Sequence, residues 1–168
     1  MSDELTQGDL TRKARAVLEA CRGARLMLAT AESCTGGMIA AALTDIAGSS
    51  DVVERGFVTY SNAAKSELLG VPAELIAAHG AVSAEVAEAM VEGALGHAPV
   101  DLAVSVTGVA GPGGATATKP VGLVYFGIMR RGRACRSERQ VFAGDRTQIR
   151  RAATIYALDL LRAAAIAP

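Results

Sequence analysis

Short, largely apolar segments typical of buried strands alternate with helix-like segments along most of this chain, and this alternation limits the possible folds more than any other feature. The strand-like segments cover residues 25–30, 52–60, 101–106, 121–129 and 134–142. The helix-like segments cover residues 9–22, 36–46, 62–69, 73–79, 84–96 and a final stretch that begins after Asp145. Such alternation is typical of a layered α/β fold with helices on both faces of a sheet.

The connection between the last two strand-like segments is a short turn at residues 130–133, which predicts a hairpin. The earlier strand-like segments are separated by helix-like segments, as parallel strands require. We therefore expect a three-layer α/β/α sandwich with a mixed, mostly parallel five-stranded sheet that ends in a hairpin. The 168 residues show no internal repeat and no dividing linker, which favours a single domain over residues 1–168.

Several residues have the chemistry of helix ends. Ser61, Ser83 and Asp145 directly precede helix-like segments, and their side chains are suited to accept hydrogen bonds from a first helical turn. Gly23 follows the helix-like stretch 9–22 and Gly70 follows the stretch that Ser61 precedes, and both are expected to end them, because glycine readily takes a left-handed conformation. These five residues therefore predict particular helix boundaries.

Charge and composition argue against some classes of function. Seventeen acidic and seventeen basic residues cancel, so the chain lacks the positive charge that attracts nucleic acid or an anionic membrane. Residues 130–133, Arg-Arg-Gly-Arg, are the one candidate for a local basic patch. The first residues, including Asp3 and Glu4, do not form a signal-peptide pattern, and no apolar run is long enough to span a bilayer.

The cysteines have neither metal-ligand nor redox-pair spacing. There are three of them, Cys21, Cys34 and Cys135, and an odd number fits a reducing compartment. We therefore expect a cytoplasmic protein that does not contact a membrane. No set of His, Cys, Asp and Glu residues has the spacing of a metal site, so no metal is expected.

Three polar stretches follow strand-like segments, at residues 32–37, 60–65 and 107–119. In open α/β sheets, ligands bind beyond the carboxyl ends of the parallel strands, so three parallel strands would bring these stretches into one crevice. The third stretch belongs to a loop over residues 107–120 with four glycines and two prolines. Loops of that length in compact domains are typically functional or disordered. We therefore look for functional residues in these three stretches.

The first of these stretches lies in the sequence TAESCTGG, which places reactive groups between an apolar strand and a helix. Ser33 would lie like a nucleophile at a strand-to-helix turn, although the glycine spacing of a hydrolase elbow is absent. Gly36 and Gly37 let a ligand approach the backbone, where free N–H groups attract an anion or a developing oxyanion. In the simpler interpretation, Ser33 or Thr35 only caps the helix. Cys34 is the rival nucleophile, with a small buried hydrophobic residue as its simpler interpretation.

A serine nucleophile needs a base, and the sequence offers few candidates. Lys65 lies in the second stretch, and a lysine crowded by apolar neighbours loses proton affinity and can act as a base near neutral pH. Tyr60 can relay a proton or hold this lysine. The alternative is that Lys65 is an ordinary solvated helix residue. His79 and His97 lie outside the three stretches and are interpreted as surface or cap residues.

Two further charged residues lie near the expected crevice. Glu32 is expected either to orient another group or to place negative charge near the helix start. Arg146 opens the final helix and is suited to hold a phosphate, with a solvated surface arginine as the alternative. The glycine-rich loop lacks the lysine–serine ending of a P-loop, which argues against a nucleoside triphosphatase. The residues alone therefore predict a crevice suited to a phosphate-bearing small molecule.

Seven motifs extend the interpretation, because they occur here in the order seen in a known family. They are TAESCTGG, DIAGSS, GFVTYSNAAK, HGAVS, VTGVAGPGG, KPVG and GDR. On these residues, from about Leu26 to the final helix, the sequence resembles the CinA C-terminal domain family. Stand-alone members of that family hydrolyse the carboxamide of nicotinamide mononucleotide, which yields nicotinate mononucleotide and ammonia. The resemblance therefore implies an amidohydrolase of pyridine nucleotide recycling.

The resemblance also implies roles for individual residues. Ser33 would attack the amide carbon, and Lys65, helped by Tyr60, would take the serine proton and deliver one to the leaving ammonia. Backbone N–H groups near residues 35–37 would form the oxyanion hole. The residues expected to bind substrate are Glu32, Thr35, Gly36, Gly37, Ser49, Thr107, Gly108, Gly111 and Arg146. The family needs no metal for this chemistry, no cofactor is expected, and a homodimer is expected.

One loop departs from the family pattern. The family commonly has an acidic residue after the motif AGP, where this chain has Gly113, and residues 115–118 also lack acidic character. The alternative function is therefore a non-catalytic module that binds pyridine nucleotides or a partner associated with competence or DNA damage. Direct nucleic-acid binding through residues 130–133 is a third hypothesis, which the neutral charge and the 4% aromatic content oppose.

Overall fold

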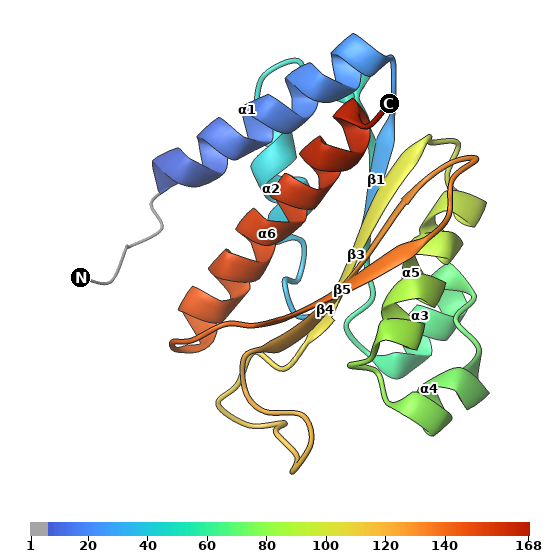
Figure 1. Ribbon diagram of the computed structural model, residues 1–168, viewed down its shortest axis with the longest axis vertical. Helices are drawn as coiled ribbons and strands as arrows, with labels where there is room; N and C mark the ends of the chain where they lie inside the picture. Colours follow the sequence, from blue (N-terminus) through green and yellow to red (C-terminus); the bar gives the residue numbers. More distant parts are fainter. Residues whose placement is uncertain (1–6) are drawn as a thin grey trace.

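The computed structural model describes residues 7–168, which form three layers with one sheet between two sets of helices (Figure 1). The predictions about Asp3 and Glu4 lie outside these described residues. The elements are α1 (Gln7–Ala24), β1 (Leu28–Glu32), α2 (Met38–Thr44), the 3₁₀ turn η1 (Ser49–Asp51), β2 (Val53–Val58), α3 (Asn62–Leu69), α4 (Ala73–His79), α5 (Ala84–His97), β3 (Leu102–Gly108), β4 (Leu123–Arg130), β5 (Arg136–Val141) and α6 (Arg146–Ile166). Helices α1, α2 and α6 cover one face of the sheet, and α3, α4 and α5 cover the other.

The sheet has five strands in the order β2-β1-β3-β4-β5. Strand β1 pairs in parallel with both β2 and β3, whereas β4 pairs antiparallel with both β3 and β5. Four strands therefore run in one direction and β4 alone runs against them. The predicted three-layer fold, with a mixed five-stranded sheet that ends in a hairpin, is confirmed.

The sheet separates two apolar cores, and alternate residues of its strands contribute to each of them. In β3, Leu102 and Val104 face the core under α1, α2 and α6, whereas Ala103 faces the core under α5. Small residues let α5 approach the sheet closely. A Cβ atom at Gly127 of β4 would lie 2.5 Å from the carbonyl oxygen of Ala87 in α5, so only glycine fits there.

The predicted helix caps are formed at three positions. The side chains of Ser61, Ser83 and Asp145 accept hydrogen bonds from the first turns of α3, α5 and α6, and Asp145 forms a capping box with Gln148. Gly70 ends α3 in a left-handed conformation, as expected.

The predicted stop at Gly23 is wrong, because α1 continues through this glycine to Ala24. Arg25 instead takes the left-handed conformation, with φ of 58°. The N–H groups of Arg25 and Leu26 then satisfy the last carbonyls, at Arg22 and Cys21, as in a helix C-cap. A glycine inside a helix costs about 1 kcal/mol relative to alanine, which the packing of α1 can offset.

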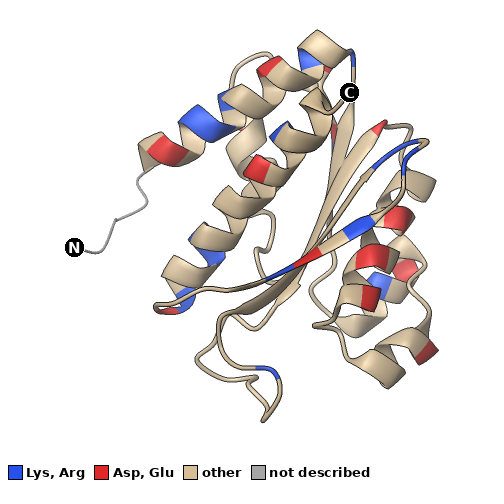
Figure 2. Cartoon of the chain, viewed as in Figure 1, with Lys and Arg blue, Asp and Glu red and all other residues tan. Residues whose placement is uncertain are grey.

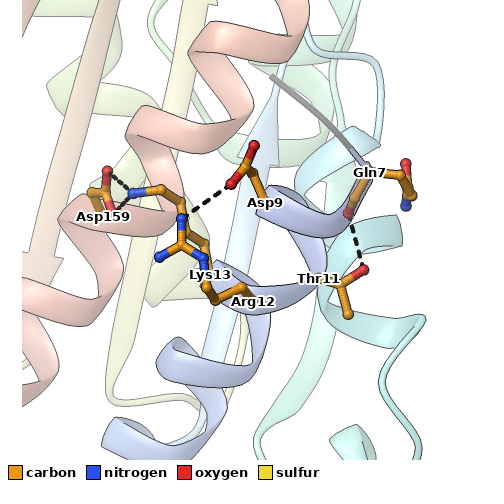
Figure 3. A network of polar contacts seen from close by, with 6 residues as sticks. All are labelled: Gln7, Asp9, Thr11, Arg12, Lys13 and Asp159. Atoms are coloured by element: carbon orange, nitrogen blue, oxygen red, sulfur yellow. Dashed lines mark hydrogen bonds and ion pairs between the residues drawn. The ribbon is translucent and has the colours of Figure 1, made fainter. Parts of the chain in front are cut away.

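Helix α1 lies alongside α6, and a polar contact joins their outer surfaces (Figure 3). Lys13 Nζ lies 2.6 Å from both carboxylate oxygens of Asp159. An exposed ion pair contributes about 0–1 kcal/mol, so the buried apolar face of α1 accounts for most of the attachment.

None of the helices in the described part of the chain is both long and apolar enough to cross a membrane.

The parallel strands β1, β2 and β3 end at one edge of the sheet, which we call the carboxyl edge. The segments that follow them are the turn over residues 33–37, the segment over residues 59–61 and the loop over residues 109–122, which extends at the bottom of Figure 1. That loop carries a single charged residue, Lys119 (Figure 2). The topology therefore brings the three predicted polar stretches to the same edge.

Candidate active site

A serine and a lysine from two of these segments meet at the carboxyl edge. Lys65, in α3, donates hydrogen bonds from Nζ to Ser33 Oγ and to the carbonyl oxygen of Thr59, both at 2.9 Å. The Lys65 side chain crosses the protein interior and is 1% exposed, and Ser33 is 8% exposed. The structure therefore excludes the interpretation of Lys65 as a solvated surface residue.

The surroundings of Lys65 favour its neutral form. Burial away from water lowers the pKa of its amine below the ordinary value of 10.5, and a weaker interaction with Cys34 opposes this shift. Among the described residues, Lys65 forms no ion pair with a carboxylate that would stabilise its charge. A neutral amine next to a serine hydroxyl is able to accept its proton.

The turn over residues 33–37, which we call the serine turn, is anchored at its start to the sheet. The N–H of Ser33 donates to the carbonyl oxygen of Val106 in β3 at 2.9 Å, and the N–H of Gly36 donates to the carbonyl of Ser33 at 3.0 Å. Gly36 and Gly37 have φ values of 59° and 100°, which residues with a side chain rarely adopt. The two glycines are therefore needed to turn the chain sharply from β1 into α2.

Glu32 does not face the site, and its expected role in substrate binding is corrected here. The residue is fully buried, and its two carboxylate oxygens accept hydrogen bonds from the N–H groups of Ile39 and Ala40, at 2.9 and 3.0 Å. Thr30 also donates its hydroxyl to this carboxylate at 3.3 Å. The Glu32 carboxylate therefore accepts hydrogen bonds from the first-turn N–H groups of α2. These groups were expected to bind an anionic ligand.

Thr35 lies within the serine turn with its side chain fully buried. Its hydroxyl oxygen has no hydrogen-bond partner among the described residues. Among the described residues, the backbone N–H groups of Cys34, Thr35 and Gly37 donate to no protein acceptor. These three N–H groups are therefore the candidates for an oxyanion hole, since the N–H of Gly36 is already engaged.

A cavity of about 190 Å³ opens beside the serine and lysine. It is lined by Ser33, Cys34, Tyr60, Asn62, Lys65, Ala81, Val82, Thr107, Gly108, Ala110 and Arg146. Two of the lining side chains are basic and none is acidic. We call this cavity the serine pocket, and the charge of Arg146 suits it to an anionic ligand.

Arg146 and Tyr60 form a pair at the pocket's rim. The Arg146 guanidinium donates to the Tyr60 hydroxyl and to the carbonyl oxygen of Gly111, both at 2.8 Å. Tyr60 is 62% exposed. The expected contact of Tyr60 with Lys65 is absent from the described residues, because the tyrosine hydroxyl is turned to the arginine instead. Arg146 therefore lies at the rim of the pocket, whereas Tyr60 does not touch the serine–lysine pair.

The residues at the end of β3 shape the pocket wall. Thr107 donates its hydroxyl to the carbonyl oxygen of Ala81 at 2.8 Å, which joins β3 to the segment before α5. A Cβ atom at Gly108 would lie 2.7 Å from Val124 Cγ2, so a side chain there would collide with β4. Gly111 lies outside the lining and contributes the carbonyl that holds Arg146.

Ser49 lies at the opposite edge of the sheet, so its expected place in the substrate site is corrected. It begins η1, directly before β2, whereas the serine pocket lies beyond the end of that strand. Ser49 is 7% exposed, and its backbone N–H and carbonyl bond to Ile46 and Val52. The motif that contains Ser49 is close to the site in the sequence, but the length of strand β2 separates it from the site in space.

Cys34 is a weaker candidate for the nucleophile than Ser33 in this environment. Burial raises the pKa of its thiol to about 12, so the reactive thiolate is scarce near neutral pH. Of the two nucleophiles considered from the sequence, only Ser33 has a base within hydrogen-bond distance. His79 and His97 are not part of the pocket lining.

Arg150, which contacts the serine turn from α6, was not predicted from the sequence. Its guanidinium donates from Nε to the carbonyl of Cys34 at 3.0 Å and from Nη2 to the carbonyl of Thr35 at 3.2 Å. The signal that could have found it is spacing, because residues four apart share a helix face and Arg146 had already been selected. Asn62, Ala81 and Val82 of the pocket lining were also missed.

The basic cluster at residues 130–133 is largely occupied by internal contacts. Arg131 donates to the carbonyl of Leu95 in the last turn of α5 and to those of Ala98 and Val100 just beyond it. Arg130 donates to three carbonyls at the end of α6. These guanidinium groups satisfy helix carboxyl ends, which weakens the hypothesis that this cluster binds nucleic acid.

In the described part of the chain, no group of three or more His, Cys, Asp or Glu side chains could hold a metal ion.

The fold and the site together define a class of protein. It is an α/β/α domain with a buried serine–lysine pair at the carboxyl edge of its sheet. The model of the CinA C-terminal domain matches residues 10–165. The chain therefore belongs to the CinA C-terminal domain family.

Proteins of two different lengths are similar to this sequence. Nicotinamide-nucleotide amidohydrolase PncC of Escherichia coli (strain K12) is 47% identical over 157 residues, which cover 94% of this chain and 95% of that protein. A CinA-like protein of Citrifermentans bemidjiense is 58% identical over 141 residues, which cover 84% of this chain but 34% of that protein. The chain thus spans about a third of the longer relative and nearly the whole of the shorter one.

Solved structures show the same fold. The competence/damage inducible protein CihA from Agrobacterium tumefaciens superposes with a TM-score of 0.90 at 47% identity, covering 92% of this chain and 94% of that one. The competence damage-inducible protein A from Klebsiella pneumoniae gives a TM-score of 0.88 at 38% identity, covering 91% of this chain and 94% of that one.

Proposed function

We propose that this protein hydrolyses the carboxamide of nicotinamide mononucleotide to nicotinate mononucleotide and ammonia. The observation that carries the proposal is the 2.9 Å hydrogen bond between Lys65 Nζ and Ser33 Oγ inside a pocket without acidic side chains. The similarity to PncC, which extends over nearly all of both chains, supports this substrate. The reaction would recycle pyridine nucleotides.

Ser33 and Lys65 carry out the first half of the reaction. Neutral Lys65 takes the hydroxyl proton as Ser33 Oγ attacks the amide carbon, and negative charge develops on the amide oxygen. The N–H of Thr35 stabilises this oxyanion, a contribution of about 2.7–4 kcal/mol for one such donor in other enzymes. The carbon–nitrogen bond then breaks, and the Lys65 ammonium returns the proton to the leaving nitrogen, which departs as ammonia.

The second half uses the same two residues in reverse. A water molecule loses a proton to Lys65 and attacks the ester carbon of the acyl-serine. The bond to Ser33 Oγ breaks, and Lys65 returns the proton to that oxygen. The nicotinate product leaves, with the serine hydroxyl and the neutral amine restored for another cycle.

Arg146 and Tyr60 bind the phosphate in this proposal. A guanidinium offers several N–H donors in a planar fork that suits a phosphate, and Arg146 has no carboxylate partner among the described residues. The Tyr60 hydroxyl, already bonded to Arg146, would join the same phosphate. The phosphate then lies at the rim and the pyridine ring lies deeper, toward Ser33.

The expected homodimer and cytoplasmic location remain predictions. For the dimer, the exposed edge of the sheet offers one candidate surface. Strand β2 is an edge strand, and Val58 at its end is 48% exposed beside the exposed Tyr60. A symmetric contact at this edge would cover both residues.

Ammonia release from nicotinamide mononucleotide tests the proposal, with the product identified by mass. The wild type should release ammonia, and Ser33→Ala should lower the rate at least about 10³-fold, as loss of a nucleophile does elsewhere. Ser50→Ala is the matched control, because this exposed serine lies at the other edge of the sheet. Equal rates for Ser33→Ala and the wild type would contradict the serine mechanism.

A non-catalytic pyridine-nucleotide-binding module is the second candidate. The observation that favours it is the departure at residues 113–118, which are all exposed and lack the acidic residue common in the family. Under this alternative, calorimetry detects nucleotide binding by the wild type while no ammonia is released.

A further inference from the structure

Arg150 lies outside the serine pocket, yet it holds the backbone of the turn that carries the nucleophile. Its guanidinium binds two successive carbonyls, those of Cys34 and Thr35. It also lies against Gly36, where a Cβ atom would be 3.2 Å from Nη2. No other charged side chain donates to the carbonyls of the serine turn in the described residues. Arg150 is therefore placed to control the orientation of these peptide units.

The direction of one carbonyl determines the direction of one N–H. The peptide bond between Cys34 and Thr35 is trans, and in a trans unit the C=O and N–H point in opposite directions. Arg150 draws the Cys34 carbonyl toward α6, so the N–H of Thr35 must point away from α6. This N–H donates to no protein acceptor in the described part of the chain. Arg150 thereby leaves this N–H without a protein partner, two residues after Ser33.

The next peptide unit shows why a second contact is useful. The Thr35 carbonyl accepts from Arg150 and also from the N–H of Met38, at 3.1 Å, while the N–H of Gly36 is engaged by the Ser33 carbonyl. Both glycines of this turn have left-handed φ values. Such residues resist rotation only weakly, since glycine has no Cβ to limit it. The guanidinium fork therefore supplies stiffness that the local sequence lacks.

We propose that Arg150 is a positioning residue, which aims the N–H of Thr35 at the oxyanion that forms when Ser33 attacks the substrate. This inference rests on the proposed amidohydrolase function. It assigns Arg150 no contact with substrate, so its loss should weaken stabilisation of the transition state and leave substrate binding unchanged.

Steady-state ammonia release separates these two effects. Arg150→Ala should lower kcat by about 10- to 100-fold, which is less than the 10²–10³-fold cost of deleting an oxyanion donor outright. KM should change less than about twofold, because the residue does not touch substrate. Arg162→Ala is the matched control, since this exposed arginine lies on the same helix and should leave both constants unchanged. A wild-type kcat for Arg150→Ala, or a loss confined to KM, would overturn the proposal.

Three further measurements distinguish positioning from general damage to the fold. Arg150→Lys keeps the charge and one of the carbonyl contacts, so it should restore part of kcat, and added guanidinium ion should raise the rate of Arg150→Ala but not of Arg162→Ala. Rescue by neither would contradict the positioning role. Amide hydrogen exchange at Thr35 gives a readout without turnover, and Arg150→Ala should change it more than Arg162→Ala does. If the wild type releases no ammonia, the proposed function fails, and unchanged Thr35 exchange would separately reject the role of Arg150.

Discussion

The two edges of the sheet treat positive charge differently. At the edge opposite the serine pocket, Arg22 pairs with Asp51, and Arg130 and Arg131 bind the carbonyls at the ends of α6 and α5. At the carboxyl edge, Lys65 and Arg146 face a cavity and have no carboxylate partner in the described residues. Arginines that pair with a carboxylate or with carbonyls at a helix carboxyl end mainly stabilise the fold. Basic groups without such partners beside a cavity remain available to a substrate.

The two arrangements also differ in their effect on the stability of the folded state. A guanidinium at a helix carboxyl end interacts favourably with the partial negative charge of the helix. A lysine buried among neutral groups loses hydration without gaining an ionic partner, so its charged form destabilises the folded state. Substitutions at the two edges should therefore move activity and stability in opposite ways.

The largest expected effect is the loss of activity in Lys65→Met. Methionine has similar length and no base, so ammonia release should fall by about 10²–10⁴-fold, the usual contribution of general base catalysis. Retention of the wild-type rate would show that another group takes the serine proton, and the contrast between the two edges would then lose its functional half.

Arg146→Ala should have the next largest effect. Removing the guanidinium should raise KM for nicotinamide mononucleotide by about 10- to 100-fold, because a charge-assisted phosphate contact contributes roughly 1.5–3 kcal/mol. The matched comparison uses nicotinamide riboside, which lacks the phosphate and should be hydrolysed equally by both proteins. An equal loss with both substrates would show that Arg146 acts on the pocket shape instead.

The pH dependence of stability provides the third prediction. The folded pKa of Lys65 lies below 10.5, so the unfolded chain binds its proton more tightly and the charged amine destabilises the fold. That penalty is complete below the lowered pKa, shrinks as pH rises toward 10.5 and is absent above it. Urea unfolding at several pH values should therefore show that the free energy of unfolding of the wild type increases relative to that of Lys65→Met as pH rises. A difference independent of pH would contradict the lowered pKa.

The smallest expected effect belongs to the opposite edge. Arg131→Ala should lower the free energy of unfolding by about 1–2 kcal/mol, because the carbonyls beyond α5 lose their donors. Its rate of ammonia release should remain that of the wild type. Arg133→Ala is the control, since this exposed arginine makes none of those contacts and should change stability by less than about 0.5 kcal/mol. A loss of activity in Arg131→Ala would break the division between the edges.

Most helix boundaries could be interpreted correctly from local chemistry, although the predicted stop at Gly23 was wrong. The apolar spacing predicted the helices and strands, and Ser61, Ser83 and Asp145 predicted three helix starts that the structure confirms. These features depend on contacts within a few residues, so no knowledge of the fold is required. The roles predicted for Ser33 and Lys65 remain predictions, although the structure brings the two side chains together.

Residues whose partners are distant in the sequence required the folded chain. Glu32 has the same carboxylate whether it binds substrate or caps α2, and only the path of the serine turn selects the second role. Ser49 belongs to a family motif but lies at the wrong edge, because β2 carries the chain across the sheet before it reaches the pocket. Arg150 meets the serine turn across 116 positions of sequence. Local chemistry determines which helices and strands form and which groups are reactive, whereas packing in three dimensions decides which of those groups meet.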